Sequence, residues 1–147
     1  MLGTLQQKRH RAQEAFRRLH NRATRQQLWS RLTRREHLLV PLALAITTNR
    51  IHHASHCGVQ SVPIGKIQGS ENRSHDFDAE FRPLKAESRE RWVNIAVAHE
   101  RDELLPAVDL IQIDDIYFVR DGHHRISVAR MIGQQEIDAN VVRWSMN

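Results

Sequence analysis

Several features are scarce in this sequence of 147 residues, and each absence excludes something. The single cysteine, Cys57, rules out an internal disulfide bond and suits a reducing compartment, so we expect a cytoplasmic protein. The longest apolar run, residues 38–46, is interrupted by Pro41 and is far too short to cross a bilayer, which predicts no transmembrane segment. It also begins too deep in the chain for a secretory signal.

Acidic residues are nearly missing from the N-terminal part of the chain. Through Cys57, eleven Lys and Arg residues face only two acids, which leaves eleven minus two, or +9. From Gly58 onward eleven basic residues face fifteen acids, which leaves −4. The basic character of the protein therefore belongs wholly to its first segment.

Glycine is absent from residues 5–46, and their only proline is Pro41, so the pattern predicts one long helix or two helices joined near Thr24. Such a basic amphipathic helix could lie on nucleic-acid phosphates, on an anionic membrane or against an acidic partner. Alternatively, its arginines are solvated and its apolar stripe packs on its own domain or on a second copy. The candidate nucleic-acid-binding residues are Arg9, Arg11, Arg17, Arg18, Arg22 and Arg25.

Residues 47–60 are predicted to be a linker. They contain the sequence His52-His53-x-x-His56-Cys57, whose side chains are metal ligands by type. Neighbouring residues cannot all point inward, so a histidine-rich surface linker is favoured over a metal site. The chain is thereby divided into a basic helical extension with linker, 1–57, and a folded domain, 58–147.

Strands and helices alternate in the second part. The pattern predicts a strand at 61–67, a polar loop at 68–83, a helix at 87–102, and a hairpin of strands at 108–113 and 116–120. A short helix from about residue 123 ends at Gly133, and a strand follows at 137–142. This order predicts an α+β domain in which a mixed sheet carries packed helices.

The turn Asp121-Gly-His-His-Arg125 is the strongest candidate site. It joins a buried strand to a helix, and the unpaired amides and positive dipole end of a helix start favour an anion such as phosphate. Arg125 would add a charge-assisted donor. The alternative is structural: Asp121 caps the helix, Gly122 makes the turn, and His123 and His124 are polar surface.

This turn, followed by Ala129, Gly133 and the strand at 137–142, resembles the phosphate-binding motif of the ParB/sulfiredoxin superfamily. Val62–Ile67 resembles the opening strand of that domain, and Leu105–Ile113 its Pro-marked strand, so the resemblance spans residues 61–143. The segment His75-Asp-Phe-Asp78 is shared with a subgroup of bacterial ParB-like proteins. Sulfiredoxins carry a reactive cysteine where this chain has His123, which disfavours their chemistry here.

The resemblance implies a nucleotide- or phosphate-binding domain, with Asp121, Gly122 and Arg125 in the site and Arg73, His75 and Asp76 closing over it. Mg²⁺ could bridge the phosphates to Asp76 or Asp121. For catalysis, the expected class is phosphoryl transfer or phosphodiester hydrolysis, with His123 or His124 as acid or base because imidazole titrates near neutral pH. The alternatives are a non-catalytic nucleic-acid-binding adaptor acting in DNA-associated processes, and a structural module that forms a homodimer.

Overall fold

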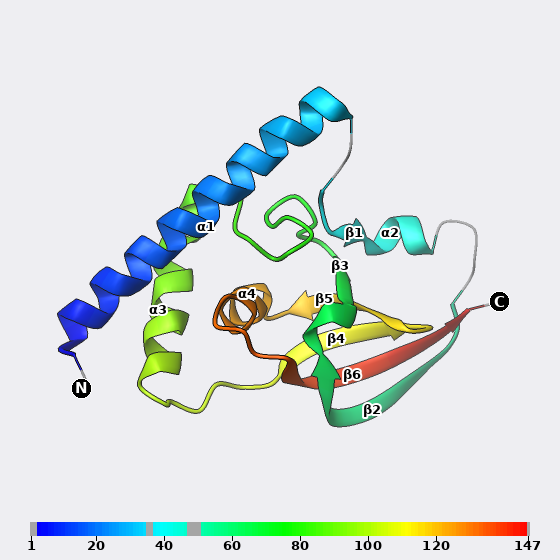
Figure 1. Cartoon of the computed structure of the whole chain (residues 1–147). Coiled ribbons are helices and arrows are strands. Elements are labelled where there is room, and N and C mark those ends of the chain that lie inside the picture. The colour runs from blue at the N-terminus through cyan, green and yellow to red at the C-terminus, as the bar shows by residue number, and fades with distance from the viewer. Residues whose placement is uncertain (1–2, 35–36, 47–50, 147) are drawn as a thin grey trace.

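The computed structural model describes residues 3–34, 37–46 and 51–146. Six strands form one mixed sheet in the order β1-β3-β5-β4-β6-β2 (Figure 1). The strands are β1 (Val40–Pro41), β2 (Ile51–Pro63), β3 (Ile67–Ser70), β4 (Val108–Ile113), β5 (Ile116–Asp121) and β6 (Glu136–Met146). The helices are α1 (Leu5–Thr33), α2 (Leu42–Ala45), α3 (Arg89–Glu100) and α4 (His123–Met131), with short 3₁₀ turns η1 (Ile64–Lys66) and η2 (Ala86–Ser88). The predicted α+β class is confirmed.

Alternation along the central strands produces two apolar layers. Leu110 of β4 faces the layer that contains Ile126 and Ala129 of α4, so α4 lies on that side of the sheet (Figure 1). The next residue, Ile111, faces the opposite layer together with Leu42 of α2. The sheet is therefore buried on both faces at its centre, and α4 is fixed where it leaves β5.

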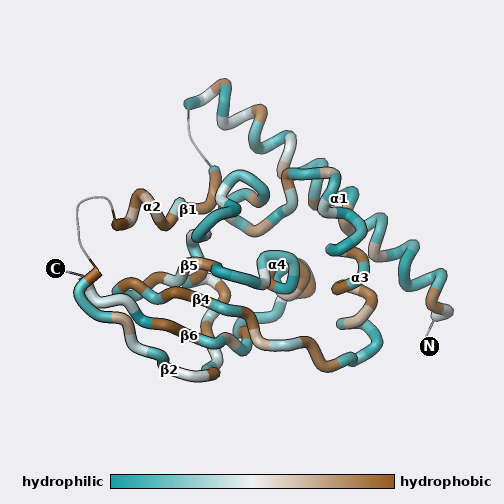
Figure 2. The backbone as a smooth tube through the Cα atoms, turned by 180° about the vertical axis from the view of Figure 1, so that it is seen from behind, coloured by the Kyte–Doolittle hydropathy of each residue, from teal (hydrophilic) through white to brown (hydrophobic). Residues whose placement is uncertain are grey.

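Helix α1 is part of the folded domain. A capping box between Thr4 and Gln7 begins it, and its apolar face packs through Ala12 and Phe16 onto Trp92 of α3. Hydrophilic residues dominate the rest of α1, which runs beside α3 (Figure 2). The helix ends at Thr33, because Arg34 adopts a left-handed conformation with φ of 58°. Both alternatives expected for residues 5–46 are therefore wrong: the helix does not break near Thr24, and it does not continue to residue 46, since β1 and α2 follow it.

The predicted linker is largely a strand. Residues 51–60 belong to β2, which pairs antiparallel with β6, while residues 47–50 lie outside the described residues. The partner strand β6 lies some eighty residues further along the chain, so no local sequence pattern could predict the pairing. The expected boundary between residues 57 and 58 falls inside this strand. His52, His53, His56 and Cys57 are exposed along it, and the described residues bring no three of them together.

Among the described residues, no helix combines the length and the apolar character that a bilayer crossing requires.

Candidate functional site: an arginine-lined pocket at the start of α4

Gly122 sets the geometry of the junction between β5 and α4. It is the N-cap residue with φ of 111°, and a Cβ atom there would lie 2.5 Å from Cγ1 of Val108. Glycine is required for two reasons: other residues rarely adopt such a φ, and any Cβ atom would clash with Val108. No side chain caps α4. Asp121 instead pairs with Arg125 at 3.3 Å, so the first amides of α4 stay open to a ligand.

A pocket of about 560 Å³ opens at this helix start. Its lining combines the expected turn with arginines from three other parts of the chain. The lining residues are Asn72, Arg73, Arg91, Ile95, Arg120, Asp121, Gly122, His123, His124 and Arg125. Asp121 is the one carboxylate among them, so the pocket is strongly positive and suits an anion.

The four arginines differ in what they contact. Arg120 donates from Nε to Glu71 at 2.8 Å. Arg125 donates to the backbone oxygens of Pro106 and Ala107, at 2.7 and 3.0 Å. It therefore ties a loop to the turn, and an alanine at this position would disturb the fold as well as any ligand, contrary to the purely ligand-binding role expected from the sequence.

Arg73 and Arg91 are different. Neither guanidinium forms a hydrogen bond or an ion pair with the part of the chain that the structure describes. Two cations without an ion pair repel one another beside the first amides of α4, and an anion with two or more charges would offset that repulsion.

The two histidines are held inside the domain. Nε2 of His123 lies 2.7 Å from Oγ of Ser70, which in turn accepts the backbone N–H of Arg73 at 2.9 Å. The Ser70 hydroxyl can give its own proton to Nε2, which leaves the neutral ring protonated at Nδ1. Phe77 stacks on His123 and meets His124 edge-on. The buried Nε2 of His124 has no hydrogen-bond partner among the described residues.

Burial lowers the pKa of His123 to about 4, and the charges of Arg73 and His124 act in the same direction against Asp121. Burial likewise lowers the pKa of His124 to about 4, helped by Arg91 and Arg73 and opposed by Asp76. Both rings are therefore neutral at pH 7. These pKa values lie below the near-neutral range expected from the sequence, because the sequence does not reveal the burial of the two rings.

These shifts predict how stability depends on pH. Between pH 6.5 and 4 the unfolded imidazoles bind protons while the folded ones stay neutral, so the free energy of unfolding should fall as the pH drops through this window. The loss should be on the order of 2–3 kcal/mol for each histidine. Urea denaturation at pH 7, 5.5 and 4.5 measures it. A His123→Gln, His124→Gln protein should show a flatter profile, and an equally steep one would contradict the assignment.

The loop at 71–85 meets the pocket with some of its expected residues but not with all of them. Arg73 lines the pocket, and the charge of Asp76 raises the pKa of His124, which also lines it. His75, however, lines a separate pocket beside α1. Asp78 Oδ1 accepts the backbone N–H groups of Glu80 and Arg82, as expected if it merely forms a turn. The prediction that His75 joins the site at α4 is therefore not supported by this arrangement.

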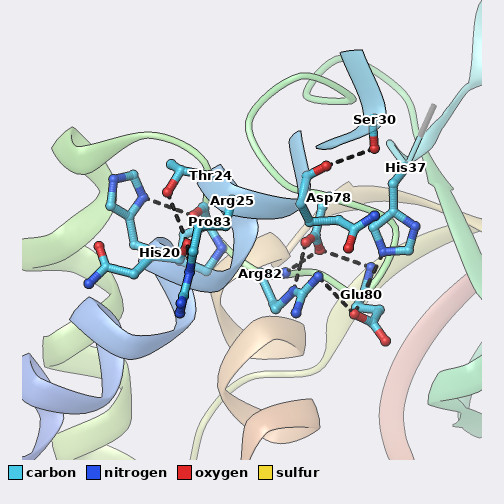
Figure 3. A network of polar contacts seen from close by, with 11 residues as sticks. His20, Thr24, Arg25, Ser30, His37, Asp78, Glu80, Arg82 and Pro83 are labelled. Carbon is cyan, nitrogen blue, oxygen red and sulfur yellow. Dashed lines mark hydrogen bonds and ion pairs between the residues drawn. The ribbon is translucent and has the colours of Figure 1, made fainter. Parts of the chain in front are cut away.

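Asp78 also belongs to a polar network between the loop and the segment after α1 (Figure 3). Among the described residues, His37, Asp78 and Glu80 bring three potential metal ligands within 4.8 Å of one another. Arg82 already binds both acids, at 2.7 Å to Asp78 and 3.0 Å to Glu80. A cation would have to displace this guanidinium, so the network serves to hold the loop.

Sequence reasoning missed several residues of the site. Arg91, Ser70 and Phe77 were not selected for the site from the sequence, because these residues reach α4 from α3, from the end of β3 and from the loop that follows it. The signal that could have found Arg91 is its place one residue before Trp92, which had to face the core. An arginine next to a buried tryptophan lies at the edge of the surface on which the tryptophan packs.

No family model matches the chain, and no curated protein matches it significantly. A search of solved structures finds a likeness to sulfiredoxin from Arabidopsis thaliana, with a TM-score of 0.42 and 18% sequence identity. It covers 56% of this chain and 82% of that one. A likeness of this extent assigns neither a family subgroup nor an activity to the protein.

Proposed function

We propose that this protein binds a nucleotide or another phosphorylated ligand in the pocket at the start of α4. The observation that supports this best is the presence of Arg73 and Arg91, two guanidiniums that form no ion pair with the described residues, beside helix amides without a side-chain cap. His124 also lines this pocket, and its buried Nε2 has no hydrogen-bond partner among the described residues. Guanidinium groups and helix amides are the groups that proteins use for phosphate.

A catalytic role is the weaker part of the expectation. The neutral imidazoles are poor general acids at pH 7, and Nε2 of His123 is engaged by Ser70. A bound polyanion would raise both histidine pKa values, since negative charge favours the protonated ring. Mg²⁺ would rest mainly on the phosphates of the ligand, because Asp121 is the one carboxylate of the lining.

Binding is tested by calorimetry with pyrophosphate and with ATP, each with and without Mg²⁺. Replacing both Arg73 and Arg91 by Gln should weaken binding by about tenfold or more for each arginine, since a charged hydrogen bond contributes about 1.5–3 kcal/mol. The fold should persist, because neither side chain has a partner to lose.

The matched control is the pair Arg101→Gln and Arg143→Gln, which removes the same charge from exposed positions outside the pocket. It should leave the affinity within about twofold, because exposed charges at a distance are screened by salt. An equal loss of affinity in the two double variants would mean that the overall charge of the protein, and not the pocket, explains the effect. If neither compound raises the melting temperature of the wild-type protein, the proposed function is wrong.

A further inference from the structure

A second basic surface lies away from this pocket, along α1 and beside α4. The sequence nominated six arginines of this helix for nucleic acid, and the structure divides them. Arg17 lies 3.8 Å from Glu14 of the same helix. Arg9 binds Asn94 and Glu90, both at 2.8 Å, and Arg11 pairs with Glu100. These contacts dock the first half of α1 on α3. Arg9 and Arg11 therefore serve to hold α1 on the domain.

From Arg18 onward, the arginines named for nucleic acid form no ion pair with the described residues. Arg18 and Arg22 form no ion pair with the described residues, and Arg25 donates only to the backbone oxygen of Asn21. Together with Trp29, these residues recur at intervals of four, three and four and so share one face of the helix. That face is exposed, and the Trp29 side chain is 60% accessible. It extends over roughly 16 Å at the rise of an α-helix.

A pocket of about 410 Å³ continues this face toward the body of the domain. Arg18 and Arg22 line it from α1, and Arg130 joins them from α4 without an acidic partner among the described residues. The fourth arginine of the lining, Arg82, is held by Asp78 and Glu80 (Figure 3). Glu80 also lines this pocket, but its carboxylate is already paired with Arg82. Three guanidiniums without an ion pair among the described residues, those of Arg18, Arg22 and Arg130, therefore line one hollow and would be stabilised by an anion.

We propose that this surface binds single-stranded nucleic acid. Arg18, Arg22 and Arg130 would hold consecutive phosphates, and Trp29 would stack on a base. An extended cationic track ending in an exposed aromatic ring fits a polymer with repeating charges better than one phosphorylated side chain. A duplex hides the faces of its bases, so the exposed indole favours a single strand. DNA and RNA share this chemistry.

The test is fluorescence anisotropy with labelled oligo(dT) and oligo(U) of about 20 nucleotides, longer than most single-strand sites. Replacing Arg18 and Arg22 by Gln should weaken binding by about tenfold or more. The slope of log affinity against log salt should become shallower by about 1.4, since each lost phosphate contact contributes about 0.7 for single strands. Trp29→Ala should weaken binding by about tenfold through lost stacking and leave the salt slope unchanged.

The matched control is Arg9→Gln with Arg11→Gln, which removes the same charge from the same helix. It should lower thermal stability, because both residues hold α1 on α3, and leave the salt slope as in the wild type. Arg73→Gln with Arg91→Gln should not affect oligonucleotide binding, which keeps this test separate from that of the pocket at α4. Point substitutions are preferable to deletion of residues 1–57, since that deletion removes α1, β1, α2 and half of β2.

Three outcomes would overturn the proposal. The first is full affinity in the Arg18, Arg22 variant, and the second is an equal loss in the Arg9, Arg11 variant. The third is stronger competition by a doubly phosphorylated peptide than by unlabelled oligonucleotide at equal charge, which would assign the surface to a phosphoprotein. Preference between oligo(dT) and oligo(U) then identifies the kind of strand.

Discussion

Gly122→Ala is expected to destabilise the domain by about 3 kcal/mol and to abolish anion binding at α4. The left-handed backbone contributes about 1–2 kcal/mol of this. The rest is steric, because the new Cβ would lie 2.5 and 2.8 Å from the side chain of Val108, which is 1% exposed and packed in the core. The helix start must shift to relieve the contact, and the amides that face the pocket shift with it. Urea denaturation and calorimetry with pyrophosphate measure the two effects.

Gly133→Ala separates the cost of a positive φ from the cost of a steric clash. Gly133 also has a positive φ, of 83°, but a Cβ there would meet no atom within 4 Å. Its cost should be only about 1–2 kcal/mol, with no loss of anion binding. Combining Gly122→Ala with Val108→Ala should cost less than the sum of the single changes, because the second removes the clash. Strict additivity would show that Val108 does not fix the turn.

Trp92→Ala is expected to cost about 3–5 kcal/mol, a large part of the stability of a domain of this size. Trp92 is fully buried, packs against Phe16 of α1, and donates from Nε1 to Ser127 of α4 at 2.9 Å. It therefore contacts both neighbouring helices, α1 and α4, from α3. Besides lowering the urea midpoint, the substitution should speed amide hydrogen exchange along α1.

Trp92→Phe is the matched variant, because it retains most of the apolar volume and removes the donor to Ser127. It should cost about 1–2 kcal/mol, the scale of one buried hydrogen bond with a small cavity. Exchange along α1 should stay close to that of the wild type. Rapid exchange of α1 in the wild-type protein itself would show that the helix is not docked in solution, and would revive the view of residues 1–57 as a separate extension.

The sequence was sufficient where structure depends on neighbours in the chain. Alternating apolar residues predicted β4 and β5, helical spacing predicted α3 and α4, and a glycine between strand and helix predicted the turn at Gly122. The clustering of the turn residues around one pocket followed from the same local geometry, since the start of a helix presents consecutive residues together.

Distant contacts were decided by the tertiary structure alone. The strand β2 looked like a linker because its partner, β6, is far along the chain and its exposed side chains do not alternate with buried ones. Arg73 and Arg91 became a pair only when a loop and α3 packed beside α4, while His75 was carried to another pocket.

The tertiary structure likewise decides which charged side chains are paired. Eleven basic residues before Gly58 determined by themselves that the first segment is cationic. Which arginines are neutralised was decided by docking, since Arg9 and Arg11 meet side chains of α3 whereas Arg18 and Arg22 face a hollow. The low pKa values of His123 and His124 likewise arise from burial against Phe77, because desolvation depends on every group that packs around the ring and spacing along the chain does not encode it.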